Sequence, residues 1–310
     1  MRIVFFGSPT EAADSLGSLI AAGHEVAAAY SQPDRKSGRG QTVTATPVKM
    51  FATQNDIPVF TPKTLRNNEE ELKRLSMFQA DVFVVVSYGR ILPQEILQIP
   101  PIGVVNIHPS LLPLYRGPSP VVTAILDGQG SVGVTVMLLD EGMDTGPVLA
   151  QSKPVQLTGR ERGAQLQDFL FREGALMLPE VLQRLQDGSL IPQLQDHSKA
   201  TGTRLIERSD GEIDWSATAE QIDRMVRAYD PWPGTFTSWN GKGLKILDVV
   251  ISNEATIGAG VVAINENRLL VGAGALTIEL KLIQLEGRQV VAAADFLRGY
   301  PGIDGATLGL

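Results

Sequence analysis

Two polar side chains that could do chemistry, Asn106 and His108, end an apolar run in the stretch GVVNIHPSLLPLYRG, residues 103–117. The run predicts a buried strand that presents an amide and an imidazole at its carboxyl end, the edge where open α/β sheets bind ligands. The two prolines of the following PSLLP fix the backbone and prevent a regular helix or central strand, so we expect a rigid apolar pocket wall. A single histidine after a strand is more often a satisfied structural residue, and this stretch alone leaves both interpretations open.

A second stretch, GVTVMLLDEGMDTG at residues 133–146, supplies carboxylates. Its alternating half predicts a strand, which then breaks into an acidic, glycine-punctuated loop that carries Asp140, Glu141 and Asp144. A carboxylate beside an imidazole fixes the tautomer of the ring and raises its basicity, as base catalysis requires. Asp144 is therefore the candidate partner of His108.

Together these stretches resemble the folate-dependent formyltransferases. NIHPSLLP, residues 106–113, is similar to their N-x-H-x-S-L-L-P signature, and DEGMDTG, residues 140–146, is similar to their D-x-G-x-D-x-G loop. The resemblance implies that Asn106, His108 and Asp144 form an active site that acts on 10-formyltetrahydrofolate. The residues that it assigns to the folate site are Ser110, Leu111, Leu112, Pro113, Tyr88, Gly89, Ile91, Leu92 and Asp140.

The chemistry of formyl transfer suggests a role for each candidate catalytic residue. A protonated amine cannot attack a carbonyl, so a proton must leave before or during addition, and His108 oriented by Asp144 is the candidate shuttle. The side-chain amide of Asn106 is the candidate donor to the tetrahedral oxyanion. Ser110 is a poor candidate nucleophile because no G-x-S-x-G turn surrounds it, so we expect no covalent intermediate.

Composition limits the class of protein. A chain of 310 residues predicts two domains, and 43% apolar with 20% charged residues is typical of globular proteins. No apolar run approaches the roughly 20 residues of a membrane helix, so we expect a cytoplasmic protein. We also expect the protein to act as a monomer. With no cysteine and three histidines, we expect no disulfide, no thiol catalysis and no metal site. A net charge of −7 argues against non-specific coating of nucleic acid but allows a local basic patch.

The elements that must position the candidate residues begin at the N-terminus. Residues 2–6 and 25–30 read as strands that flank a helix with apolar spacing over residues 12–20. The turn after the first strand has one glycine instead of G-x-G-x-x-G, which favours a Rossmann-like connection over a dinucleotide site. DVFVVVS, residues 81–87, predicts a strand buried on both faces that delivers residues 88–92 to the edge of His108. The predicted fold class is α/β, with a Rossmann-like, mostly parallel sheet.

The second half of the chain has a different pattern. Apolar spacing over residues 166–185 predicts a long amphipathic helix, preceded by capping-box spacing at 158–161. Short strands between residues 236 and 285, separated by glycine, predict a small OB-like β-barrel. IDW at residues 213–215, PWPG at 231–234 and DFLRG at 295–299 resemble the family's C-terminal domain. The predicted domains are the folate-binding catalytic domain at 1–190, a linker at 191–208 and a tRNA-binding β-barrel at 209–310.

The acceptor is predicted from QPDRKSGRGQTVTATP, residues 32–47, which carries Arg35, Lys36 and Arg39 against Asp34. Such a loop is ordinarily solvated and inert, but P-D-R-x-x-G-R-G resembles the loop with which family members that formylate methionyl-tRNA engage the acceptor end. Arg39 is the candidate contact to phosphate or to the terminal base pair because a guanidinium suits both. The implied reaction formylates methionyl initiator tRNA for translation initiation.

The charge of the C-terminal region leaves alternatives open. Residues 199–248 hold seven Lys or Arg against eight Asp or Glu, a net of −1, so Arg204 and Arg208 reach tRNA only if basic residues share one face. ATGTRLI, residues 200–206, also lacks the tyrosine that the family places near Gly202. The alternative acceptors are an amino-sugar nucleotide or water. A catalytically silent folate- or RNA-binding module is the alternative outside enzymes.

Overall fold

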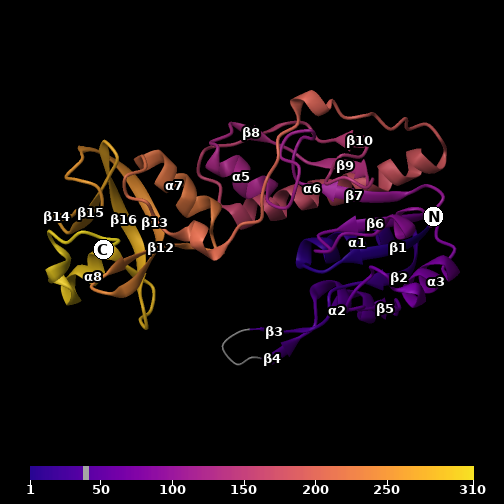
Figure 1. Ribbon diagram of the computed structural model, residues 1–310, viewed down its shortest axis with the longest axis horizontal. Helices are drawn as coiled ribbons and strands as arrows, with labels where there is room; N and C mark the ends of the chain where they lie inside the picture. The colour runs from indigo at the N-terminus through magenta and orange to yellow at the C-terminus, as the bar shows by residue number, and fades with distance from the viewer. Residues whose placement is uncertain (38–41) are drawn as a thin grey trace. The chain divides into compact units, whose positions relative to one another are not determined.

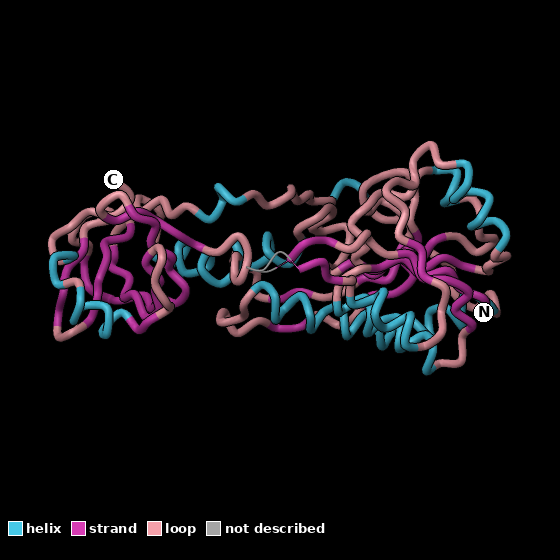
Figure 2. Tube along the Cα trace, turned by 90° about the horizontal axis from the view of Figure 1, so that it is seen from below, coloured by secondary structure: helices cyan, strands magenta, loops and turns pink. Residues whose placement is uncertain are grey.

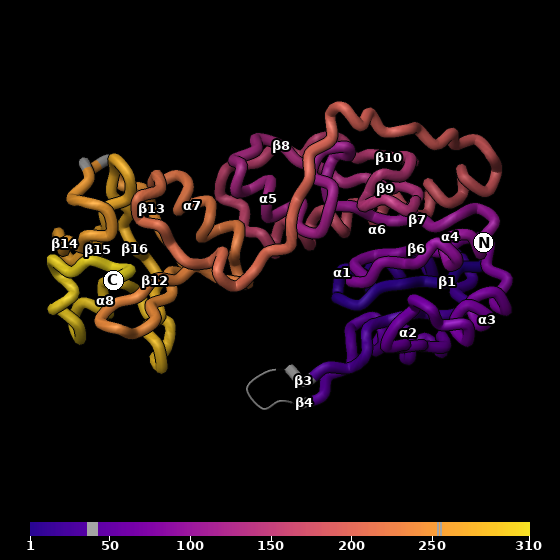
Figure 3. Tube along the Cα trace, in the orientation of Figure 1, coloured from indigo at the N-terminus to yellow at the C-terminus, as the bar shows by residue number. Residues whose placement is uncertain are grey.

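The computed structural model describes residues 1–37 and 42–310, without the side chains of residues 36, 37, 42, 253 and 255. Figure 3 follows the chain through two compact units. The first unit comprises Met1–Pro120, Ser131–Val155 and Gln167–Thr203. The second unit comprises Val121–Gly130, Gln156–Leu166 and Arg204–Leu310. Within the described residues, no helix is both long and apolar enough to span a membrane.

A seven-stranded sheet forms the centre of the first unit (Figure 1). Its strands, in spatial order, are β10 (Val148–Gln151), β9 (Thr135–Leu138), β7 (Val104–His108), β6 (Val82–Val86), β1 (Arg2–Gly7), β2 (Glu25–Tyr30) and β5 (Val59–Phe60). All pairings from β7 to β5 are parallel, whereas β9 runs antiparallel to both of its neighbours. The predicted α/β class with a mostly parallel, Rossmann-like sheet is confirmed.

Helices cover both faces of this sheet, as Figure 2 shows. They are α1 (Thr10–Ala21), α2 (Pro47–Gln54), α3 (Glu69–Met77), α4 (Gln94–Leu97) and most of α6 (Gly163–Gln186). Successive side chains of a strand point to opposite faces, so Ile3 and Phe5 pack in the core that α1, α2 and α6 share. Val4 and Phe6 pack in the core on the side of α3 and α4. Burial on both faces explains why β6 and residues 3–6 of β1 are continuously apolar.

Helix α6 lies directly against β7, the strand that carries the candidate catalytic residues. An added Cβ at Gly174 would lie 2.5 Å from Ile107 Cγ2, so only glycine allows this approach. The predicted helix over residues 166–185 is confirmed, with slightly wider bounds. The capping-box spacing at 158–161 does not cap this helix, because Glu161 Oε1 accepts the backbone N–H of Thr158 in a loop that precedes it.

Residues 32–47, predicted to be a loop, contain the short hairpin β3 (Arg35–Ser37) and β4 (Thr42–Thr44), which Figure 1 shows extending from the first unit near α2. The hairpin base is anchored by an ion pair of 2.7 Å between Lys49 Nζ and Asp34 Oδ2. A further small sheet pairs β8 (Ser131–Val132) with β11 (Val155–Gln156). Helix α5 (Pro120–Leu126) precedes β8.

The second unit is built on an antiparallel sheet. Its strands pair in the order β12 (Thr235–Trp239), β13 (Lys242–Ala255), β16 (Leu276–Leu285), β15 (Arg268–Ala273) and β14 (Val262–Asn265), and β17 (Val291–Ala292) joins β16. The remaining elements of the region are α7 (Ala219–Ala228), α8 (Ala293–Gly299) and the 3₁₀ turns η2 (Arg208–Gly211) and η3 (Pro301–Ile303). Residues of α7 and α8 pack with the strands in one apolar core. The predicted separate, strand-rich C-terminal domain is confirmed.

The division into units differs from the predicted domain limits at two places. Residues 191–203 of the predicted linker belong to the first unit, and residues 204–208 belong to the second. Residues 121–130 and 156–166 also cluster with the second unit, where Leu157 N donates to Gly130 O and Ala164 N donates to Asp230 O. Backbone hydrogen bonds do not depend on the type of side chain, so the spacing of apolar residues in the sequence could not predict them. The linker limits of 191 and 208 stay a prediction.

Candidate active site

Asn106 and His108 share one face of β7, opposite Val105 and Ile107. Asn106 is in register with Val85 of β6 on one side and with Met137 of β9 on the other. Parallel strands bring their carboxyl ends to one edge, so the segments that follow β6 and β7 meet there, as predicted.

Asp144 comes from a loop that begins at the other end of the sheet from His108. Because β9 is antiparallel to β7, the loop after β9 leaves the sheet at the opposite end from His108. This loop closes on itself where Leu138 N donates to Pro147 O at 2.9 Å, and an added Cβ at Gly146 would lie 1.9 Å from Leu138 O. Only glycine fits that closure, which lets the loop return Asp144 Oδ2 to 3.6 Å from His108 Nδ1.

The two ring nitrogens of His108 face different partners. Nε2 lies 2.9 Å from the carbonyl oxygen of Tyr115, and since a carbonyl only accepts, Nε2 carries the hydrogen. The neutral ring therefore directs its lone pair from Nδ1 toward Asp144. Burial lowers the pKa of His108, while the Asp144 charge and the Tyr115 carbonyl act in the opposite direction.

Two details of the expected pair are thus corrected. The Tyr115 carbonyl, and not Asp144, selects the tautomer of His108, because 3.6 Å is too long for a hydrogen bond. Asp144 favours the charged imidazole as expected, but the greater effect of burial leaves the pKa of His108 below its ordinary value. The lowered pKa favours the neutral form of the ring, which is the form that can accept a proton.

The side chain of Asp144 is only 13% exposed and is held from several sides. Its Oδ2 accepts the backbone N–H of Gly117 at 2.7 Å. Its backbone has φ = 53°, the left-handed region that few non-glycine residues adopt. The buried amide of Gln195 donates to the carbonyl oxygens of Asp144 at 2.9 Å and Gly146 at 2.7 Å. Sequence reasoning missed Gln195, which lies in the predicted linker without any motif.

Hydrogen bonds hold the proline-bounded loop after β7 against the neighbouring strands. Ser110 is buried and its hydroxyl donates to Leu114 O at 2.6 Å, which agrees with a structural role instead of a nucleophilic one. Thr135 Oγ1 donates to Ser110 O and accepts from Leu112 N. Gln151 Nε2 donates to Leu112 O at 2.8 Å. Thr135 and Gln151 lie on β9 and β10, so only the sheet pairing reveals their role.

The other residues assigned to the folate site have contrasting surroundings. Tyr88 is 2% exposed with its ring against Phe6, and burial raises its pKa to about 12. Leu92 is buried, whereas Ile91 is 78% exposed. Asp140 is exposed, and its Oδ1 accepts from Gly142 N and Thr145 Oγ1, so it shapes the loop that carries Asp144. Gly89 has φ = 76°, and Leu111 and Pro113 lie in the loop after β7. Folate binding by these residues stays a prediction.

The structure describes only some of the residues assigned to tRNA binding. Arg39 and the side chain of Lys36 lie outside them, and Arg35 is exposed at the start of β3. Arg204 forms an ion pair with Asp210 at 2.5 Å, and this contact lowers the pKa of Asp210 to about 2. Arg208 is exposed at the start of η2. Arg204 is therefore already neutralised by an acidic neighbour.

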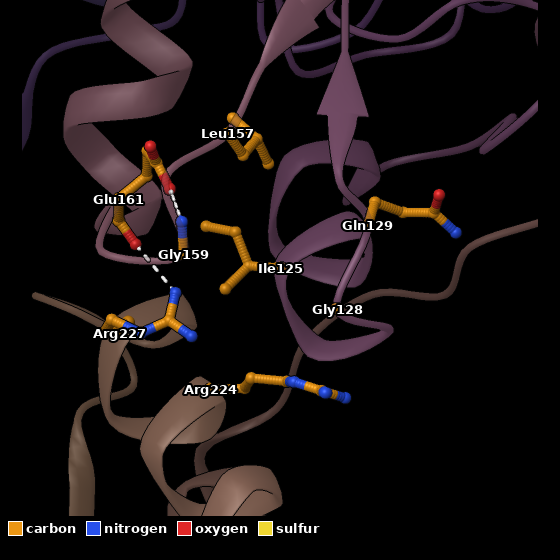
Figure 4. Close-up of a pocket in the computed structure, with 8 residues that line it drawn as sticks. All are labelled: Ile125, Gly128, Gln129, Leu157, Gly159, Glu161, Arg224 and Arg227. Carbon is orange, nitrogen blue, oxygen red and sulfur yellow. Dashed lines mark hydrogen bonds between the residues drawn. The ribbon is translucent and has the colours of Figure 1, made fainter.

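The second unit contains a cavity of about 170 Å³ (Figure 4). Its lining residues are Ile125, Gly128, Gln129, Leu157, Gly159, Glu161, Arg224 and Arg227. Although burial acts to raise it, hydrogen bonds from Thr158 and Gly159 hold the pKa of Glu161 below its ordinary value. Arg227 Nη1 donates to Glu161 O at 3.2 Å. None of these eight residues offers a free base, so the cavity does not compete with the His108 site.

Fold and site together define a class of protein. Residues 1–182 match the Formyl transferase family and residues 205–301 match the Formyl transferase C-terminal domain, so the chain belongs to the formyl transferase family. It is 46% identical over 302 residues to methionyl-tRNA formyltransferase of Chloroflexus aurantiacus, covering 96% of this chain and 97% of the relative. It is 41% identical over 315 residues to the enzyme of that name in Dehalococcoides mccartyi, covering 100% and 99%.

Solved structures share the fold at lower identity. WlaRD, a sugar 3N-formyl transferase crystallised with dTDP and 5-N-formyl-THF, aligns with a TM-score of 0.66 at 20% identity, covering 93% of this chain and 99% of that one. HypX from Aquifex aeolicus in complex with tetrahydrofolic acid aligns with a TM-score of 0.62 at 18% identity, covering 99% of this chain. The chain spans about half the length of HypX, 48%. These alignments establish the fold of the chain.

Proposed function

We propose that the protein transfers the formyl group of 10-formyltetrahydrofolate to the α-amino group of methionyl initiator tRNA. The observation that supports it most is the pair of His108 and Asp144, on the same side of β7 as Asn106, in a chain similar over 96% of its length to a methionyl-tRNA formyltransferase. N-formylmethionyl-tRNA then serves translation initiation. This reaction would take place in the cytoplasm, where tRNA is charged.

The proposed transfer makes one C–N bond, breaks another and moves one proton from the amine to the donor. The amine nitrogen attacks the formyl carbon, so a new C–N bond forms and the formyl oxygen becomes an oxyanion. The bond from the formyl carbon to N10 of the donor then breaks, and the proton lost by the amine passes to N10. Nδ1 of His108 is the atom that receives this proton, because Nε2–H is held by Tyr115 O. Asp144 stabilises the imidazolium, and such base catalysis contributes about 10² to 10⁴ in rate.

Asn106 is suited to stabilise the oxyanion. Its half-buried side chain lies on the same face of β7 as His108 and has no hydrogen-bond partner among the residues that the structure describes. A free amide N–H beside the base can donate to the oxyanion without first breaking a protein contact. Loss of one such donor costs about 10² to 10³ in kcat.

The acceptor is tested by direct comparison. Purified protein receives labelled formyl donor with methionyl initiator tRNA, with an amino-sugar nucleotide, or with water alone, and formylated product and formate are measured. We expect label in tRNA at a rate at least about 10³ times that in the other two products. Preferential labelling of the sugar, or formate release equal to transfer, would identify another acceptor. No turnover of any kind would favour the silent binding module.

A further inference from the structure

A segment of the first unit, residues 195–203, lies across both loops that flank the active site; we name it the strap. It contains the 3₁₀ turn η1 (His197–Lys199). One end follows the bridge between Val148 and Gln193, beside the Asp144 loop. The other end forms a parallel bridge between Arg116 and Gly202, beside the loop after β7.

Gln195 fixes the strap to the Asp144 loop with all of its polar atoms in use. Its amide Nε2 donates to the carbonyl oxygens on either side of Thr145, those of Asp144 and Gly146. Its Oε1 accepts from Arg116 Nε at 3.0 Å and Nη2 at 2.7 Å. Gln195 is only 7% exposed, so these bonds are shielded from water.

These bonds matter because Asp144 has the left-handed backbone described above. A non-glycine residue relaxes from that conformation unless neighbouring groups hold it. Rotation of the Asp144 peptide would move the carboxylate away from His108 Nδ1. The two donors of Gln195 hold the carbonyls that such a rotation would displace.

The other end of the strap holds the second partner of the imidazole. Thr201 Oγ1 accepts the backbone N–H of Tyr115 at 2.8 Å, and Thr201 N donates to Pro113 O at 3.2 Å. The carbonyl of the same Tyr115 accepts from His108 Nε2. The strap therefore holds one group at each nitrogen of the ring.

We infer that the strap positions the catalytic histidine: Gln195 holds Asp144 against Nδ1 of His108, and Thr201 holds Tyr115 against Nε2. Gln195 and Thr201 are positioning residues, since they act through Asp144 and Tyr115. The kinetic consequence rests on the proposed formyl transfer. The effect on the ionisation of His108 does not depend on the reaction.

Two substitutions of Gln195 distinguish its bonds to the Asp144 loop from its bonds to Arg116. Gln195→Met removes the donors and the acceptor at similar length. Gln195→Glu keeps an acceptor for Arg116 but replaces the donors to the Asp144 loop with a charged oxygen that repels the carbonyls of Asp144 and Gly146. We expect both variants to lose at least about tenfold in kcat, with KM for donor and acceptor changed by less than about twofold. Gln193→Ala is the matched control, because that side chain is exposed and should leave kcat unchanged.

Thermal unfolding and circular dichroism accompany each variant. Wild-type kcat in Gln195→Glu would show that attachment to Arg116 suffices and would overturn the inference. Thr201→Val tests the other end, since it removes the acceptor for Tyr115 N–H at nearly constant volume. We expect a similar loss of kcat. A wild-type kcat in Thr201→Val would show that Thr201 does not position His108.

A second readout does not need turnover. The chain has three histidines, so ¹⁵N-labelled imidazoles can be followed individually through a pH titration, with His24 as internal reference. Asp144 is the titratable group facing His108, and its displacement in Gln195→Met should lower the pKa of His108 by about half a unit or more. An unchanged pKa in this variant would contradict the positioning role. Failure of wild-type protein to formylate tRNA would contradict the proposed function and leave this titration valid.

Discussion

Replacement of Asp144 by asparagine tests the charge of the catalytic pair with little change in shape. The asparagine carbonyl can still accept from Gly117 N, so the loop should keep its position. What is lost is the attraction between the carboxylate and the imidazolium that forms at His108 during transfer. At an effective dielectric constant of about 20, unit charges 3.6 Å apart interact by about 5 kcal/mol.

Only part of that charge develops at the transition state. An effective loss of about 3 to 4 kcal/mol corresponds to a fall of about 10² to 10³ in the rate of transfer. The assay is single-turnover formylation of methionyl-tRNA by excess enzyme, which isolates the chemical step. Glu141→Gln removes an exposed charge from the same loop and serves as the control. A rate for Asp144→Asn within about threefold of wild type would refute the electrostatic argument.

Three further outcomes follow from the site. Asn106→Ala should lower kcat by about 10² to 10³ while the free energy of unfolding stays close to wild type, because the amide has no partner among the described residues; parallel kinetics and urea unfolding check this, and a kcat near wild type would remove the oxyanion role. Thr135→Val should destabilise the protein by about 1 to 3 kcal/mol in urea unfolding, since Leu112 N and Ser110 O lose a buried partner; a change below about 0.5 kcal/mol would argue against this network. Burial lowers the pKa of His108, so the unfolded chain binds a proton at this residue more tightly than the folded chain does. Above about pH 6.5 the histidine is neutral in both states, and its burial then costs the folded protein no stability through proton binding. The free energy of unfolding should fall as the pH drops below 6.5, and His108→Gln should reduce that dependence; an identical dependence in both proteins would contradict it.

The sequence predicted the strands of the first unit well, for a clear physical reason. Burial on both faces requires the continuous apolar run of residues 82–86, whereas a strand with one face in water would interrupt such a run with polar residues. His108 and Asp144 could be paired because both stretches carry dense, unusual motifs. Their separation of 3.6 Å agrees with that prediction.

The remaining features depend on contacts that no local pattern encodes. The antiparallel direction of β9 and the return of its loop depend on a backbone closure at Gly146. The tautomer of His108 is selected by a backbone carbonyl, at Tyr115, which any residue type could supply. Gln195 acts from a polar segment without apolar period, so its burial becomes visible only in the fold. Arg39, the main candidate for tRNA contact, lies outside the described residues.

The most direct measurement is the single-turnover rate of formyl transfer to methionyl initiator tRNA by His108→Ala, beside wild type. Binding of the folate donor, followed by calorimetry, shows whether the variant keeps an intact site. We predict a loss of about 10² to 10⁴ in rate with donor affinity unchanged, because proton removal from the amine loses its acceptor. A rate near that of wild type would contradict the account.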